Sequence, residues 1–178
     1  MVAPSLSESE QHFLRALLSR KVRFIVVGLS AAALQGAPVV TQDVDLWFED
    51  LTDPRIIESL REVGAAYVPP SLQNPPMFAG GGIELFDIVQ RMDGLKKFAQ
   101  EWSECVVIPF GTQKLKLLSL ERILASKRAA NRTKDRLVIP VLEDSLATSS
   151  VSLKPKATKT RSTNRLVTTK NSVRSKKK

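Results

Sequence analysis

Apolar residues near the N-terminus recur at helical spacing and then give way to a continuous apolar run. Ser7 and Glu10 have the spacing of a capping box, and the apolar positions that follow predict a helix ending near Arg20. Residues 23–28 (RFIVVG) are apolar and β-branched up to the glycine, which favours a central strand. Residues 30–36 then predict a short helix that ends at a glycine.

Segments with helix-like and strand-like patterns continue to alternate along the chain. This alternation predicts an α+β domain, layered as in α/β folds, with a mixed β-sheet and flanking helices. Asp53 and Pro54 combine a capping residue with proline at the first helical position, so a helix should start there. Pro140 should kink or break the last helix. The expected elements after residue 36 are strands over 43–48, 83–89 and 105–110, an edge strand over 114–118, helices over 54–63, 94–102, 120–131 and 134–146, and a loop over 69–82.

Charge is distributed unevenly along the chain, and the change in charge indicates a boundary between a domain and a tail. The net charge is +9, yet all 18 acidic residues fall within residues 1–148, and residues 149–178 are rich in Lys, Arg, Ser and Thr. A segment without acids, aromatics or hydrophobic periodicity cannot bury enough surface to fold. We therefore predict a folded domain over 1–148 and a disordered basic tail over 149–178. That tail either binds RNA or another polyanion or only adds solubility.

Cysteine usage and the N-terminal composition bear on location. Cys105 is the single cysteine, so an intramolecular disulfide framework is excluded. The N-terminal stretch lacks the basic start and apolar core of a secretion signal, and no apolar run approaches the roughly 20 residues that a membrane span needs. We expect a cytoplasmic protein without a membrane partner.

Two carboxylates, Asp43 and Asp45, interrupt an otherwise apolar predicted strand. Residues two apart on a strand point to the same side, so both should project together. Such charges repel, and a divalent cation such as Mg²⁺, which prefers carboxylate and phosphate oxygens, would relieve the conflict. Asp87 interrupts another strand and could add a third ligand that also accepts the proton of an attacking hydroxyl. Alternatively, the pair lies at a strand end in water, since D-x-D is a common chance pattern.

Gly28 ends a buried strand and leads into the short helix expected to start near Ser30. In that arrangement a backbone and a helix N-terminus can approach a phosphate. A glycine after a strand also occurs simply as a turn, so both interpretations stay open at this point.

Lys127 falls on the apolar side of the helix predicted over 120–131. Either it reaches a triphosphate or the carboxylate cluster, with Arg132 and Lys134 extending the positive wall, or its ammonium snorkels to water. Asp135, near the start of the last helix, is interpreted as a residue that complements the helix dipole.

Two stretches of the sequence resemble a known superfamily. Residues 26–48 (VVGLSAAALQGAPVVTQDVDLWF) are similar to the signature of the polymerase-beta-like nucleotidyltransferases: a strand, a glycine turn, a short helix and T-x-D-x-D on the next strand. They look closest to small bacterial nucleotidyltransferases of the kind that includes the AbiEii-like (type IV toxin) enzymes. Residues 117–146 resemble the closing helical segment, in which a lysine and an R-x-K-D element face the nucleotide. Leu29 departs from the pattern, since many members carry glycine or serine there, and an arginine often found before T-x-D-x-D is missing.

The resemblance implies a nucleotidyltransferase fold and an enzyme that moves a nucleoside monophosphate from an NTP to a hydroxyl acceptor, using Mg²⁺ or Mn²⁺. The acceptor would be RNA, such as tRNA, or protein. Such an enzyme could be the toxin of a toxin–antitoxin or phage-defence system, with an antitoxin protein as partner. The implied roles are metal binding by Asp43, Asp45 and Asp87, acceptor activation by Asp87, phosphate binding by Gly28, Ser30, Arg132 and Lys134, and charge neutralisation by Lys127.

A non-catalytic function is the alternative. A degenerate nucleotidyltransferase fold could act as a module that binds nucleic acid or protein. Leu29 and the missing arginine favour this alternative, whereas the three retained aspartates favour the enzyme.

Overall fold

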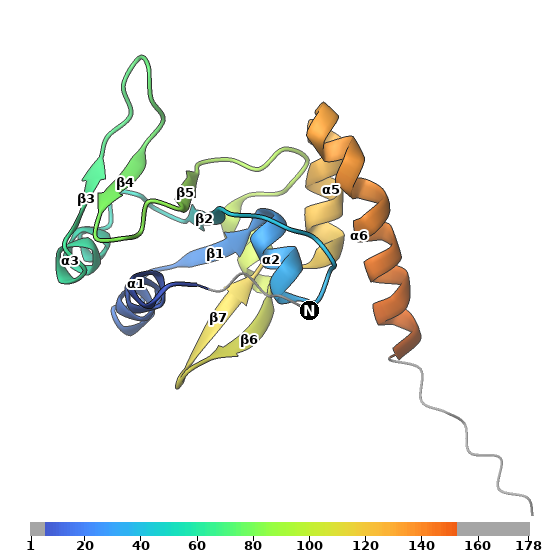
Figure 1. Cartoon of the computed structure of the whole chain (residues 1–178), viewed down its shortest axis with the longest axis horizontal. Coiled ribbons are helices and arrows are strands. Elements are labelled where there is room, and N and C mark those ends of the chain that lie inside the picture. Colours follow the sequence, from blue (N-terminus) through green and yellow to red (C-terminus); the bar gives the residue numbers. More distant parts are fainter. Residues whose placement is uncertain (1–5, 153–178) are drawn as a thin grey trace, which may run out of the picture.

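A computed structural model describes residues 6–152, with the backbone alone described for 149–152. Its strands are β1 (Phe24–Val27), β2 (Val44–Phe48), β3 (Ala65–Val68), β4 (Met77–Gly80), β5 (Phe86–Val89), β6 (Val106–Phe110) and β7 (Gln113–Leu117). Within the described residues they form one seven-stranded sheet in the order β3-β4-β5-β2-β1-β7-β6 (Figure 1). Antiparallel β1–β2 pairing beside parallel β2–β5 and β1–β7 pairing makes the sheet mixed, as predicted.

Helices flank this sheet on both faces. They are α1 (Glu8–Ser19), α2 (Gly28–Leu34), α3 (Pro54–Glu62), α4 (Phe98–Ser103), α5 (Leu120–Ala130) and α6 (Thr133–Ser152). Phe13 of α1 packs on Phe78 and Phe86, with ring centroids 5.3 and 5.6 Å apart, and α1 also contacts α3, so these two helices cover one face. On the other side α2 packs on β1 and β2 and contacts α5, which lies along α6 (Figure 1). The predicted α+β class with flanking helices is confirmed.

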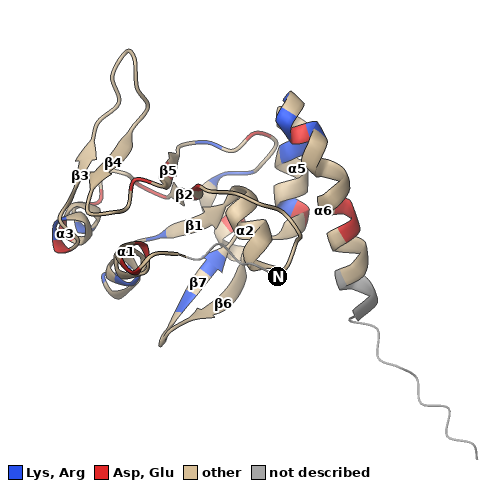
Figure 2. Cartoon of the chain, viewed as in Figure 1, with Lys and Arg blue, Asp and Glu red and all other residues tan. Residues whose placement is uncertain are grey.

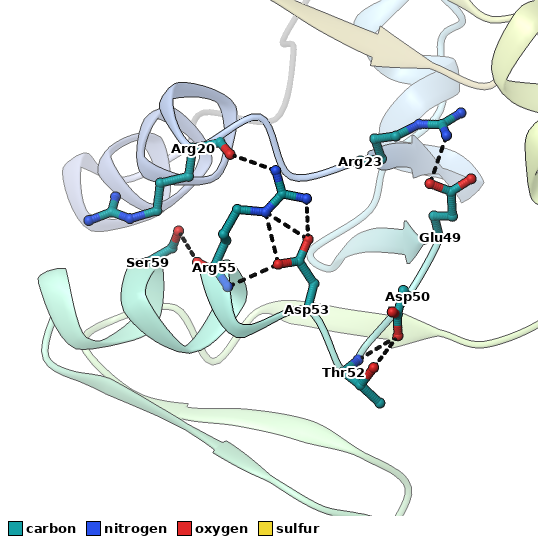
Figure 3. Close-up of polar contacts among 8 residues, drawn as sticks. All are labelled: Arg20, Arg23, Glu49, Asp50, Thr52, Asp53, Arg55 and Ser59. Atoms are coloured by element: carbon teal, nitrogen blue, oxygen red, sulfur yellow. Dashed lines mark hydrogen bonds and ion pairs between the residues drawn. The ribbon is translucent and has the colours of Figure 1, made fainter.

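Capping residues place the first helices as the sequence predicts. Ser7 and Glu10 form a complete capping box at the start of α1, and the Asp53 carboxylate accepts the Arg55 N–H at 3.0 Å to cap α3. As Figure 3 shows, the Arg55 guanidinium donates hydrogen bonds to the same carboxylate and to the backbone carbonyl of Arg20. The bond to the Arg20 carbonyl is 3.2 Å long. This contact ties the start of α3 to the end of α1.

The prediction of an edge strand over 114–118 is wrong, because β7 lies between β1 and β6. Leu115 and Leu117 of β7 are fully buried, whereas Val106 and Val107 of β6 are exposed. A strand that carries buried leucines on one face gains most from an interior position, so β6 takes the edge. Sequence patterning gave no information on which of the two strands would pair with β1.

The loop expected over 69–82 is also partly wrong, because β4 lies inside it and pairs antiparallel with β3 and β5. Phe78 is the reason: its ring is buried against the aromatic core, and this burial holds a short strand in place among prolines and glycines. The remaining connection forms a long hairpin loop (Figure 1). The short helix predicted from Ser30 begins two residues earlier, at Gly28.

At the C-terminal end of the described region, α6 runs without a break through Pro140 to Ser152. Proline removes one helix hydrogen bond and frees the carbonyl of residue 136, but both residues are exposed, so water can satisfy that carbonyl. The rest of the predicted disordered tail, residues 153–178, lies outside the described residues, and the domain boundary stays a prediction. Within residues 6–152, none of the helices is sufficiently long and apolar to cross a membrane.

Candidate active site

Parallel pairing of β2 and β5 brings the predicted carboxylates together. Asp45 lies opposite Asp87 in the register, and residues that face each other across neighbouring strands present their side chains to the same face. Asp43 precedes β2 by one residue, and all three aspartates line one cleft of about 360 Å³. The far wall of this cleft comes from α5 and α6, which also supply Lys127 and Lys134.

Burial and neighbouring negative charge raise the pKa values of Asp45 and Asp87. Burial, followed by the charge of Asp87, raises the pKa of Asp45 to about 6, although Lys127 and Lys134 act in the opposite direction. Burial, followed by the charge of Asp43, also raises the pKa of Asp87. Carboxylates whose pKa values are raised by burial and by each other, inside a cleft, are a signature of functional sites.

The backbone of Gly28 packs directly against the carboxylate of Asp45. Its φ of +65° lies in the left-handed region, and a β-carbon at this position would stand 1.9 Å from Asp45 Oδ2. Glycine is therefore needed twice, once for the backbone conformation and once for the space that the carboxylate fills. The left-handed backbone and the close approach account for glycine at the start of α2, and phosphate binding there stays a prediction.

Replacing Gly28 with alanine is expected to disturb the site as well as the fold. Gly111 provides a matched control, since its φ is +60° and a β-carbon there meets nothing within 4 Å. We expect Gly111→Ala to cost about 1 kcal/mol of stability for the left-handed conformation alone. Gly28→Ala should cost more and should also weaken at least about tenfold the NTP binding that the sequence resemblance implies, because Asp45 is displaced. Thermal melts and NTP titrations of both variants make the comparison, and equal behaviour would contradict the steric role of Gly28.

Ser30 is not brought to the cleft. Its side chain is fully buried, and its hydroxyl donates to the backbone carbonyl of Val27 at 3.0 Å. Leu29 lines the cleft instead. Because α2 begins at Gly28, its first turn points the Ser30 hydroxyl back along the helix and away from the space in front of the aspartates.

Lys127 is held by a buried ion pair on the far wall. Its Nζ lies 2.9 Å from Oδ1 of Asp135, a residue only 1% exposed at the start of α6. Arg132 contacts the other oxygen of this carboxylate through its backbone N–H at 3.2 Å and its Nε at 3.3 Å. Burial alone would raise the pKa of Asp135, but the hydrogen bond and charge of Lys127 hold it below its usual range. Lys127 therefore does not simply snorkel to water: Asp135 fixes it in the cleft wall, where its charge also acts on Asp45.

Three residues of the cleft were missed as site residues from the sequence. Asp135 was interpreted as a helix-dipole residue, and its ion pair with Lys127 depends on the angle between α5 and α6, which no local pattern encodes. Arg91 and Asp93 follow β5 and line the same cleft. Their position just after the strand that carries Asp87 is a signal that could have identified them, because polar residues at strand ends often reach a site.

The carboxylate oxygens in this cleft are suitable ligands for a divalent cation. Carboxylate oxygens are the ligands that Mg²⁺ prefers, and Asp43, Asp45 and Asp87 supply them to one space. No group of three or more His, Cys, Asp or Glu side chains among residues 6–152 is already gathered closely enough to hold a metal ion. Asp45 and Asp87, which face each other in the register, are best placed to share a cation, and the metal-binding role of all three aspartates stays a prediction.

Comparison with solved structures defines the class of fold. The crystal structure of ANT(2″)-Ia in complex with adenylyl-2″-tobramycin has a TM-score of 0.52 and 19% sequence identity, covering 79% of this chain and 89% of that one. The solution structure of the same antibiotic-resistance factor has a TM-score of 0.53 and 17% identity, covering 81% and 85%. The chain therefore has the nucleotidyltransferase fold. Neither a protein-family model nor a curated protein matches the sequence.

Proposed function

We propose that this protein is a nucleotidyltransferase that moves a nucleoside monophosphate from an NTP to a hydroxyl acceptor with the help of Mg²⁺ or Mn²⁺. The observation that carries the proposal is the facing pair Asp45 and Asp87 in one cleft with the Lys127 ammonium. A fold shared with a protein whose complex contains an adenylylated antibiotic supports the reaction class. A cleft of about 360 Å³ lies within the range of roughly 300–1,000 Å³ typical of small-molecule sites, so it suits a nucleotide.

In the proposed reaction the acceptor oxygen forms a bond to the α-phosphorus of the NTP, and the bond from that phosphorus to pyrophosphate breaks. Asp87 is the more exposed of the facing carboxylates, and its raised pKa suits it to accept the proton of the attacking hydroxyl. Lys127, with Lys134 beside it, stabilises negative charge that develops on the phosphates. A bound divalent cation would neutralise the carboxylates and the triphosphate; the facing pair Asp45 and Asp87 would hold it, with Asp43 as a third ligand.

More specific assignments remain proposals that rest on the sequence resemblance. These are kinship with AbiEii-type enzymes, a toxin or phage-defence role, and RNA, such as tRNA, or protein as acceptor. The competing hypothesis is a degenerate domain that only binds. Leu29 supports it, because this bulky side chain lines the cleft where glycine or serine would leave room for phosphate.

Binding of NTP is expected to require a divalent metal, because without it the triphosphate would face carboxylates of like charge. Calorimetric titrations of ATP, GTP, CTP and UTP in Mg²⁺ and in EDTA measure this dependence. The double variant Asp43→Asn/Asp45→Asn should lose the metal-dependent component, whereas Asp144→Asn, an exposed acid on α6 outside this cleft, should not. Equal NTP binding in EDTA would remove the metal-site hypothesis, and binding without transfer to any acceptor would favour the non-catalytic module.

A further inference from the structure

A second pocket, of about 540 Å³, adjoins the cleft where β2 and β5 end, and we call it the side pocket. Its lining comprises residues 47–49 and 90–98. Arg91, Met92 and Asp93 line both this pocket and the cleft, so the two spaces meet at these three residues. The volume of the side pocket lies within the range of roughly 300–1,000 Å³ typical of small-molecule sites. A nucleotide in the cleft would therefore leave room for a second small molecule beside it.

The side pocket lies on the carboxylate face of the sheet. Trp47 follows Asp45 by two residues on β2, so the two side chains share a face. Val89, which lines the cleft, lies opposite Trp47 in the register and follows Asp87 by two residues. Two residues of strand span about 7 Å. A compound the size of a sugar phosphate, with its anionic group in the side pocket, can thus bring a hydroxyl to the facing carboxylates.

The connection between β5 and α4, which separates the two spaces, packs on α5 (Figure 1). Gly94 has a φ of +68°, and a β-carbon there would stand 2.4 Å from the β-carbon of Ala129. Asp93 adds ion pairs with Arg91 at 3.6 Å and with Arg132 at 3.7 Å. On the sheet side, the rings of Trp47 and Phe98 pack edge to face with centroids 5.4 Å apart. The side pocket is therefore a preformed concave space with packed walls, as small-molecule sites usually are.

Positive charge in the side pocket exceeds negative charge. The charged residues that line it are Arg91, Lys96, Lys97, Glu49 and Asp93, and Figure 2 shows charged segments along the connection that leaves β5. Both acids are already paired with arginines, because Glu49 lies 2.8 Å from Arg23 and Asp93 contacts two arginines. Within residues 6–152, the Lys97 ammonium has no ion-pair or hydrogen-bond partner. A ligand in the side pocket therefore meets net positive charge, and an anionic group gains most from it.

We propose that the side pocket is the acceptor subsite and takes a small hydroxyl compound that carries an anionic group, a phosphate or a carboxylate. Lys97 and Arg91 bind the anionic group, and the hydroxyl faces Asp87. This inference rests on the proposed function and names its acceptor class. In the transfer the acceptor oxygen bonds to the α-phosphorus of the NTP, pyrophosphate leaves, and the hydroxyl proton passes to Asp87.

The first test measures binding and needs no catalysis. Calorimetry on the full-length chain in EDTA compares glucose 6-phosphate, glucuronate and glucose, so the phosphate and the carboxylate are tested separately. At least one anionic sugar should bind about tenfold more tightly than glucose, and Lys97→Glu should remove this preference. Lys114→Glu is the matched control, since Lys114 is an exposed lysine on β7 that lines neither the cleft nor the side pocket. Equal binding of glucose, no binding of either anion, or equal effects of the two variants refutes the anion site.

The second test measures transfer from labelled NTP with Mg²⁺ or Mn²⁺. The acceptors are the same three sugars, tobramycin as a cationic polyhydroxyl compound, total RNA, and mixed peptides that contain Ser, Thr and Tyr. Label is expected mainly on an anionic sugar. Preferential labelling of glucose, tobramycin, RNA or peptides overturns the acceptor assignment but leaves the proposed reaction standing. Absence of transfer to every acceptor overturns both.

Variants of Lys97 then separate the acceptor from the nucleotide. Lys97→Met should lower kcat/KM for the anionic sugar about tenfold, through KM, with an unchanged Kd for the NTP. Lys97→Arg keeps the charge and should retain most of the activity, and Lys114→Met should be silent. If Lys97→Met weakens NTP binding by the same factor as it raises KM for the sugar, the side pocket belongs to the nucleotide and the acceptor assignment is refuted.

Discussion

Replacing Lys127 with methionine is expected to lower the rate of the proposed nucleotidyl transfer by about 10²- to 10³-fold, the usual cost of losing one charge-assisted contact in the transition state. Methionine keeps an aliphatic stem of similar length and removes the ammonium that lies 2.9 Å from Asp135. Stability should also fall, by about 1 to 3 kcal/mol, because a buried carboxylate loses one partner while Arg132 keeps its contacts. Single-turnover transfer and a thermal melt measure the two effects.

Two further variants separate catalysis from structure at this position. Lys127→Met combined with Asp135→Asn removes the orphaned buried charge, so it should recover stability without recovering the transfer rate. Arg128→Met, one residue along α5, breaks an exposed ion pair with Glu143 and should stay within about 0.5 kcal/mol of the parent, with an unchanged rate. Should the double variant regain activity together with stability, Lys127 would be only a structural partner of Asp135.

Replacing Asp45 with asparagine is expected to abolish metal-dependent transfer and yet to stabilise the fold at neutral pH. The pKa of Asp45 is raised to about 6, chiefly by burial and then by Asp87, so its ionised form is disfavoured in the folded state. A shift of about 2 pH units corresponds to about 2 to 3 kcal/mol of stability lost at pH 7. Asparagine carries no charge, so the variant avoids this cost while keeping nearly the same shape.

The sign of this effect depends on pH in a defined way. Unfolded Asp45 releases its proton near pH 4, and the folded residue releases it at about pH 6. Between these values the folded state binds the extra proton, so the parent loses stability as pH rises through the window. Asp45→Asn should therefore match the parent below about pH 4 and exceed it most above about pH 7. Asp50 is a suitable control, since hydrogen bonds from Thr52 lower its pKa and Asp50→Asn should not stabilise the fold at any pH. Denaturant titrations between pH 4 and 8 would refute the assignment if the stability difference for Asp45→Asn did not grow with pH.

Local chemistry determined the features that sequence alone predicts correctly. The Ser7 capping box and the Asp53 cap fix two helix starts, because each side chain bonds a backbone N–H within three residues of itself. The continuous apolar run of β1 marks a strand buried on both faces. Asp45 lies on β2 and Asp43 one residue before it, and both line the cleft, as expected for residues two apart on an extended chain.

Tertiary packing decided the rest, because it depends on partners distant in the sequence. Asp87 lies beside Asp45 only through the parallel register of β2 and β5, and β7 takes the interior position because it carries two buried leucines, whereas Val106 and Val107 of β6 are exposed. Packing of α6 against α5 places Asp135 on Lys127 and gives the cleft its positive wall. Burial of Phe78 holds β4 beside β5 and so sets Met77 next to Asp87. Sequence thus identified residues able to carry the chemistry, whereas the distances between them arise from long-range burial, which no local pattern encodes.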